Sequence, residues 1–130
     1  MTRPLTAADL VTDARARIRE VAPAAFAAAP GEAILVDVRE PAEFETGHIP
    51  GAINIPRGVL EFQVDAHPAV ARVSDPALSH KDRPLVLACR TGGRAALAAD
   101  TLQRMGFSDV RSIAGGVTAW AEAGLPLVVR

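Results

Sequence analysis

The chain has 130 residues, with 14 basic and 15 acidic side chains and a pI near 6.3. That length suits one compact domain, and an apolar content of 49% excludes a largely disordered chain. The near-neutral charge argues against a general nucleic-acid binder, which needs a basic face. A single cysteine excludes an intramolecular disulfide and a cysteine-rich zinc site.

The first residues lack the pattern of a secretory signal. No apolar run approaches the roughly 20 residues of a membrane-spanning helix, because Pro23, Pro30 and Gly31 interrupt the alanine-rich stretches. With the lone thiol, these features predict a cytoplasmic protein that does not bind membranes. We expect a helical extension over residues 1–17 and one compact domain over residues 18–130.

The first half of the chain is predicted to alternate helices with strands. Thr6 and Asp9 form the pattern of a capped helix start, and Leu10, Ala14 and Ile18 are spaced along one helical face. The elements predicted next are a strand over residues 18–21, a helix over 24–29 after Pro23, a buried strand over 33–38, a short helix around Phe44 and a turn, strand and turn over 48–56.

The second half begins with its least regular stretch, residues 57–83, in which prolines cut any helix short. The elements predicted after it are a buried strand over residues 85–88, a helix over 95–105, a strand over 110–113 and a last helix that carries Trp120. Strands that alternate with helices predict an α/β fold, with a parallel sheet covered on both faces.

Cys89 lies at the junction between the buried strand 85–88 and the following helix. Ligands of open α/β sheets bind at the carboxyl ends of strands, beside helix N-termini. Gly92 and Gly93 let the loop curl so that N–H groups point inward, and the helix dipole and nearby arginines favour a thiolate. The same donors suit a tetrahedral oxyanion, to which Arg94 adds a positive charge, whereas Arg90 faces either substrate or water.

A lone cysteine is often a small buried apolar residue. The position of Cys89 argues against that interpretation, because the segment R-T-G-G-R that follows it is rich in charged residues and glycine, which rarely fill a hydrophobic core. The loop therefore predicts a nucleophilic sulfur inside an anion-binding site.

Three segments resemble the signatures of rhodanese-like domains. Residues 37–56, D-V-R-E-P-A-E-F-E-T-G-H-I-P-G-A-I-N-I-P, resemble the first signature. Residues 89–94, C-R-T-G-G-R, resemble the persulfide-forming loop of single-domain sulfurtransferases, and residues 115–126, G-G-V-T-A-W-A-E-A-G-L-P, resemble the C-terminal signature. The resemblance covers residues 18–129 in the order and spacing of the family.

The resemblance implies a rhodanese-like fold, an open parallel five-stranded sheet with helices on both faces. It also implies that the Cys89 thiolate attacks the outer sulfur of a small anionic donor such as thiosulfate and then holds a persulfide. Cyanide, a cellular thiol or a partner protein would take the sulfur, without a metal or an organic cofactor. The residues expected to bind substrate are Arg90, Thr91, Gly92, Gly93 and Arg94.

Three further residues are expected to support the loop. Asp37 and Arg39 are predicted to form a structural network beneath it, with Arg39 pairing with Glu43 or Glu45. Arg57 either lines the mouth of the pocket or lies in solvent. The segment 57–83 is longer than in the smallest family members and is a candidate cover for the pocket.

Two alternatives to a sulfurtransferase stay open. Cysteine phosphatases and arsenate reductases of the dual-specificity type have one more residue between cysteine and arginine. Here Arg94 is the fifth residue after Cys89, and this shorter loop favours a sulfur atom over a phosphoryl group. The second alternative is a persulfide-relay or regulatory module. Retention of Cys89 and Arg94 argues against an inactive binding domain, but does not separate turnover from relay.

Overall fold

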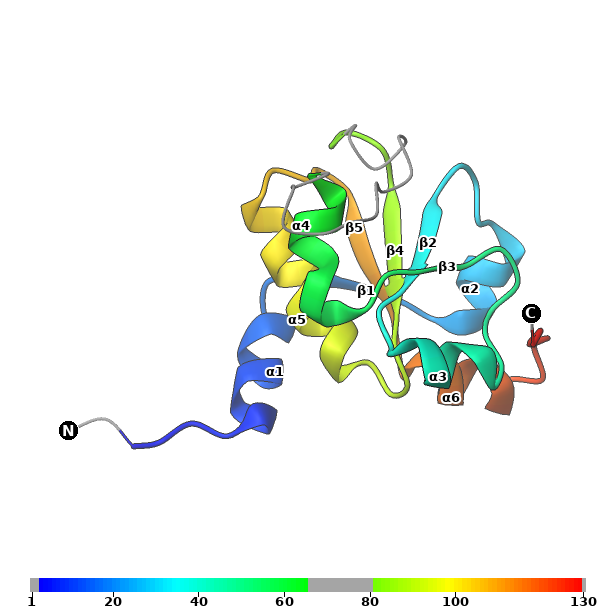
Figure 1. Cartoon of the computed structure of the whole chain (residues 1–130), viewed down its shortest axis with the longest axis horizontal. Helices are drawn as coiled ribbons and strands as arrows, with labels where there is room; N and C mark the ends of the chain where they lie inside the picture. The colour runs from blue at the N-terminus through cyan, green and yellow to red at the C-terminus, as the bar shows by residue number, and fades with distance from the viewer. Residues whose placement is uncertain (1–2, 66–80, 130) are drawn as a thin grey trace.

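The computed structural model describes residues 3–65 and 81–129 (Figure 1). A five-stranded sheet lies at its centre in the order β1-β5-β4-β2-β3, and every neighbouring pair is parallel. This confirms the predicted parallel α/β sheet. The strands are β1 (Arg19–Val21), β2 (Ile34–Asp37), β3 (Ile53–Asn54), β4 (Leu85–Ala88) and β5 (Val110–Ile113).

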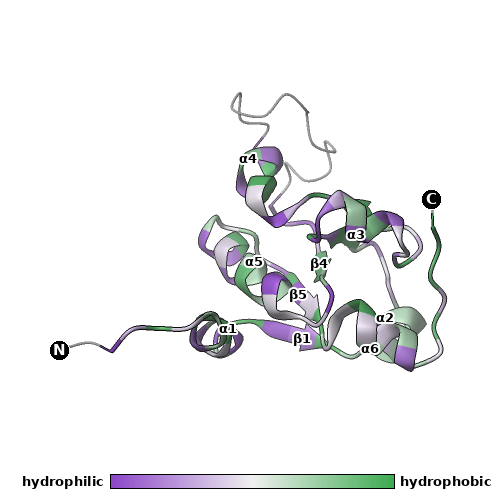
Figure 2. Ribbon diagram, turned by 60° about the horizontal axis from the view of Figure 1, so that its bottom comes forward, coloured by the Kyte–Doolittle hydropathy of each residue, from purple (hydrophilic) through white to green (hydrophobic). Residues whose placement is uncertain are grey.

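Helices cover both faces of this sheet, as Figure 2 shows for α5 on one side and α2 with α6 on the other. The helices are α1 (Ala7–Arg15), α2 (Pro23–Ala28), α3 (Pro41–Glu45), the 3₁₀ turn η1 (Arg57–Val59), α4 (Leu60–Val64), α5 (Gly93–Arg104) and α6 (Gly116–Glu122). No described helix is long and apolar enough to cross a membrane.

Strand β4 is buried along its whole length and divides the core in two. Its side chains alternate between the faces of the sheet. Leu85 and Leu87 pack into the cluster that α4 and α5 cover, whereas Val86 and Ala88 join the cluster on the side of α2 and α6. Continuous apolar strands of this kind are typical of parallel sheets that are buried on both faces.

The register of β2 and β4 positions the candidate site. Asp37, the last residue of β2, pairs with Ala88, the last residue of β4. The segments that follow these two strands therefore begin side by side at the same edge of the sheet. Cys89 and Arg39 lie on these segments, so the fold brings two predicted site regions together from positions 50 residues apart.

The inward face of α1 differs from the prediction. Ala14 is buried as expected, but Leu10 is 46% exposed, and Val11 instead faces Gly93 of helix α5. The helix ends at Arg15, before Ile18, so the i, i+4, i+8 spacing that linked Leu10 to Ile18 does not describe one helical face. The predicted division into residues 1–17 and 18–130 stays a prediction.

The segment 57–83 also begins more regularly than predicted. Leu60 and Val64, four residues apart and both buried, lie within the helix α4 that follows η1. The prediction of an irregular stretch is therefore wrong for residues 57–64. Residues 66–80 lie outside the described residues, and the suggested cover over the pocket lies largely among them.

Candidate active site

The Cys89 thiol is buried at the end of β4, with 1% of the residue exposed. Two backbone N–H groups donate to its Sγ, from Gly92 at 3.1 Å and from Ala95 at 3.4 Å. Gly92 has a φ of 108°, which turns the loop back over the sulfur, and Ala95 lies in the first turn of the 12-residue helix α5. The sulfur therefore lies between two N–H donors at the N-terminus of α5, where the partial charges of the helix are positive.

Helix α6 supports the loop from behind. The N–H groups of Val117 and Thr118 donate to the carbonyls of Cys89 and Arg90, at 2.8 and 3.0 Å. In a trans peptide the next N–H points opposite to the carbonyl, so the N–H groups of Arg90 and Thr91 point away from α6. Neither has a hydrogen-bond acceptor among the described residues. The loop thus has two N–H groups available for a bound anion.

A glycine is required where α6 meets the loop. Gly116 has a φ of 64°, and a Cβ added there would lie 2.4 Å from the oxygen of Cys89 and 2.6 Å from that of Arg90. Any side chain would force the helix away from the loop. The sequence G-G-V at 115–117 therefore fixes the direction of the loop peptides.

Asp37 and Arg39 form a buried ion pair below the loop. The guanidinium donates to the carboxylate from Nε at 3.0 Å and from Nη2 at 2.8 Å, and Nη2 also reaches the Gly47 carbonyl at 2.8 Å. Asn54 donates to the carbonyls of both residues. The network was predicted, but Arg39 does not pair with Glu43 or Glu45. A cation buried this deeply needs a buried anion at contact distance, and Asp37 supplies it.

Arg94 pairs with Glu43 instead. Its Nη1 and Nη2 donate to the two carboxylate oxygens at 2.7 and 2.9 Å. This contact lowers the pKa of Glu43 from 4.5 to about 2 and raises the pKa of Arg94. Helix α3 therefore braces the arginine at the start of α5.

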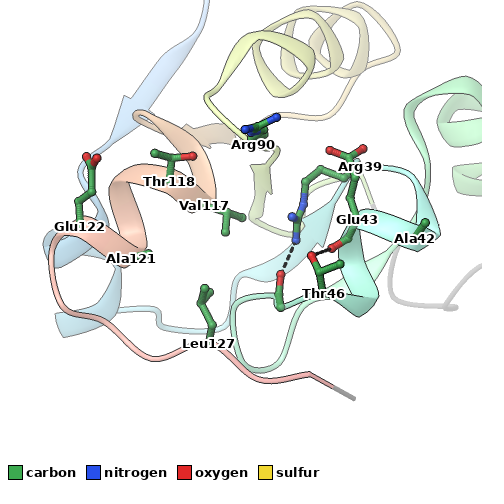
Figure 3. Close-up of a pocket in the computed structure, with 11 residues that line it drawn as sticks. Arg39, Ala42, Glu43, Thr46, Arg90, Val117, Thr118, Ala121, Glu122 and Leu127 are labelled. Atoms are coloured by element: carbon green, nitrogen blue, oxygen red, sulfur yellow. Dashed lines mark hydrogen bonds between the residues drawn. The ribbon is translucent and has the colours of Figure 1, made fainter.

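A pocket of about 670 Å³ opens beside the loop, between α3 and α6 (Figure 3). Arg90 is the loop residue that lines it, whereas Cys89 is buried and is not among the lining residues. The other lining residues are Arg39, Ala42, Glu43, Thr46, Gly47, Val117, Thr118, Ala121, Glu122 and Leu127. Arg57 is not among them, because its side chain pairs with Glu61 at 2.9 Å and reaches Thr101 at 3.3 Å.

The structure brings together most of the predicted site residues. Gly92 is buried below the loop surface, and the side chains of Arg90 and Thr91 are exposed. Gly93 begins α5, two residues before the predicted helix start. Among the described residues no group of histidine, cysteine and acidic side chains is placed to hold a metal ion.

Sequence reasoning missed Arg15, which reaches the loop from α1. A Cβ added to Gly92 would lie 3.2 Å from Arg15 Nη2. The guanidinium also lies 3.6 Å from Glu20. No spacing in the sequence links position 15 to position 92, and only the packing of α1 against α5 brings them together.

Comparison with known proteins gives consistent matches. A model of the Rhodanese-like domain family matches residues 22–123. A sulfurtransferase of Allochromatium vinosum is 35% identical over 97 residues, which cover 75% of this chain and 79% of the relative. Thiosulfate sulfurtransferase 16, chloroplastic, of Arabidopsis thaliana is 37% identical over 94 residues, which cover 70% and 76%.

A solved structure from Rhodopseudomonas palustris resembles the whole fold, with a TM-score of 0.84 and 33% identity over 98% of both chains. It is described as a protein of unknown function and possible tyrosine phosphatase. The curated relatives support sulfurtransferase activity for this chain.

Proposed function

Because the chain belongs to the rhodanese-like domain family, we propose that its sulfurtransferase activity runs through a persulfide on Cys89, with thiosulfate as the donor. The observation that carries this proposal is the position of Cys89 Sγ. It accepts hydrogen bonds from the backbone N–H groups of Gly92 and Ala95 at the start of α5. The relative from Arabidopsis thaliana is a thiosulfate sulfurtransferase by name, which supports the choice of donor.

In the first half-reaction the Cys89 thiolate attacks the outer sulfur of thiosulfate. A sulfur–sulfur bond forms to Sγ, and the bond within thiosulfate breaks, so that sulfite leaves with the electron pair. The product is a Cys89 persulfide anion, and the total charge is conserved. The N–H groups of Arg90 and Thr91, which have no acceptor among the described residues, are suited to hold the donor oxygens or the outer sulfur.

In the second half-reaction a nucleophile attacks the outer sulfur of the persulfide. The bond to Sγ breaks and its electron pair returns to Cys89 as the thiolate. Cyanide would leave as thiocyanate, and a thiol would leave as a new persulfide. Neither half-reaction needs a metal or an organic cofactor, because each is a nucleophilic attack on the outer sulfur that releases a stable anion.

The two alternatives make different predictions for the same loop. A phosphatase would hydrolyse an aryl phosphate, as the description of the Rhodopseudomonas palustris structure suggests for that protein. A relay module would load sulfur but release it slowly to cyanide and quickly to a partner thiol. The four residues between Cys89 and Arg94 favour sulfur over a phosphoryl group.

The proposed function is tested by thiocyanate formation from thiosulfate and cyanide. Cys89→Ser is expected to abolish turnover with the fold retained, as judged by circular dichroism. Arg94→Ala is expected to reduce kcat/KM for thiosulfate by an amount on the order of 1.5–3 kcal/mol, the range for a lost charge-assisted hydrogen bond. Arg104→Ala, at the other end of α5, is the matched control. Aryl phosphate hydrolysis without sulfur transfer would overturn the proposal.

A further inference from the structure

Arg15 brings a positive charge to the Cys89 loop from a helix that precedes the family domain. It is the last residue of α1, whereas the family model matches residues 22–123. We propose that Arg15 is a specificity-determining residue, which makes the loop prefer sulfur donors of higher negative charge, and that Glu20 limits this preference. The inference rests on the proposed function, because it concerns the approach of the donor to Cys89.

The guanidinium of Arg15 lies close to the loop residue that contacts the sulfur. A Cβ added to Gly92 would lie 3.2 Å from Arg15 Nη2, and the Gly92 N–H donates to Cys89 Sγ at 3.1 Å. Because the bonds of Gly92 between these points are each about 1.5 Å long, Nη2 lies within about 9 Å of Sγ. Charges interact over about 30 Å at an ionic strength of 0.01 M. The charge of Arg15 therefore acts on an anion that reaches the sulfur.

The charge of Arg15 is only loosely compensated. Its Nε lies 3.6 Å from Glu20 Oε2, and both side chains are partly exposed. Its side chain donates no hydrogen bond to the residues that the structure describes. Arg94, in contrast, donates to both carboxylate oxygens of Glu43, at 2.7 and 2.9 Å. Arg90 is exposed and has no side-chain ion pair within the described part of the chain, so Arg15 and Arg90 contribute net positive charge beside the loop.

The position of Arg15 is fixed by the packing of α1 against α5 (Figure 1). The side chain of Arg17 donates to the Asp100 carboxylate from Nε at 2.9 Å and from Nη2 at 2.7 Å. Gln103 Nε2 donates to the Arg17 carbonyl at 3.0 Å. These bonds hold the end of α1 beside α5, and Arg15 extends from there toward Gly92. The charge thus has a defined place relative to the loop.

Two donors that differ by one charge measure this effect at the sulfur. Methanethiosulfonate is thiosulfate with a methyl group in place of one oxygen, so it carries one negative charge instead of two. The Cys89 thiolate forms a bond to the outer sulfur of either donor, and the sulfur–sulfur bond of the donor breaks. Sulfite or methanesulfinate leaves with the electron pair, and the product is the same persulfide. The ratio of the two loading rates therefore cancels the thiolate fraction of Cys89 and reports the effect of the extra charge.

The test measures second-order rates of persulfide formation with each donor at low ionic strength, from the mass of the intact protein. Arg15→Gln is expected to lower the thiosulfate-to-methanethiosulfonate ratio about two- to four-fold, the size of a Coulomb interaction over this separation near a protein surface. Arg15→Lys keeps the charge and is expected to keep the ratio. Glu20→Gln is expected to raise the ratio, because Arg15 then loses its counter-ion. Added salt should reduce each difference, whereas a loosened loop would slow both donors alike.

Arg19→Gln is the matched control, because it removes an exposed arginine charge away from the loop. Arg19 begins β1 and pairs with Asp109, just before β5, at 2.7 Å. Since the strands are parallel, this pair lies at the opposite end of the sheet from Cys89, and the variant is expected to keep the native ratio.

Three outcomes would overturn the inference. They are a ratio that Arg15→Gln leaves unchanged, an equal fall in Arg19→Gln, and a fall in Glu20→Gln. Failure of the native chain to load sulfur from both donors would reject the proposed function instead.

Discussion

Glu43 binds both terminal nitrogens of Arg94, at 2.7 and 2.9 Å, and so ties helix α3 to the first turn of α5. The arginine of the loop is therefore half of an ion pair rather than an isolated cation. An anionic donor that approaches Cys89 meets a guanidinium whose charge the carboxylate already compensates. Glu43 thus moderates the positive charge that the loop would offer to the proposed anionic donor.

Replacing Glu43 should strengthen donor binding. Glu43→Gln removes one negative charge beside Arg94, and we expect the KM for thiosulfate to fall about two- to five-fold, the size of a partly exposed charge effect. The effect should shrink as salt is added, because exposed charges are screened. Steady-state kinetics at two ionic strengths measure both. A higher KM would mean that Glu43 is needed to position Arg94.

The same ion pair predicts how stability depends on pH. Arg94 lowers the pKa of Glu43 from 4.5 to about 2, so the folded state holds the proton less tightly than the unfolded state. The stabilisation is then complete above pH 4.5 and is lost as the pH falls toward 2. Thermal melts of the native chain and Glu43→Gln should differ by a constant amount above pH 4.5 and converge below it. A gap that widens with acid would contradict this assignment.

Gly116 should tolerate no side chain. In Gly116→Ala the new Cβ would clash with the carbonyls of Cys89 and Arg90, and the positive φ adds backbone strain. We expect a loss of about 2–4 kcal/mol in the free energy of unfolding together with most of the activity. Gly124→Ala is the control, because Gly124 has a φ of 79° but nothing within 4 Å of an added Cβ. Equal losses for both variants, measured by urea unfolding, would show that the contact with the loop is unimportant.

The buried pair of Asp37 and Arg39 should behave as one unit. Arg39→Met leaves the Asp37 carboxylate buried without its cation, which is expected to cost about 3–5 kcal/mol. Asp37→Asn leaves the guanidinium unpaired in the same way. The double variant should lose less than the sum of the two, since neither charge then remains. Urea unfolding of all four proteins completes the cycle, and strictly additive losses would exclude a coupled pair.

The sheet and the loop after β4 were predictable because local signals specify them. The apolar run of β4 needs burial on both faces, and Gly92 supplies the positive φ that turns the loop after Cys89. Three signatures in register then identify the fold. These features depend on residues that are neighbours in the sequence, where propensity and spacing are informative.

The charge partners were not predictable in the same way. Asp37 and Arg39 were expected in one network, but the sequence also favoured Glu43 or Glu45 as the partner of Arg39. In the structure Arg39 pairs with the buried Asp37, and Glu43 pairs with Arg94, 51 residues away. Similarly, Arg15 meets Gly92 only because α1 packs on α5. Leu127 lines the pocket because backbone bonds to His48 hold the C-terminal segment in place. Such pairings depend on tertiary packing and carry no periodic signal in the sequence.

In the proposed mechanism Cys89 carries the transferred sulfur. The most direct measurement is the mass of the intact protein after brief exposure to thiosulfate, with Cys89→Ser as control. Since Cys89 is the only cysteine, an added sulfur needs no further mapping. We expect a gain of one sulfur atom in the native chain and none in the variant. No gain in the folded native chain, or an equal gain in Cys89→Ser, would contradict it.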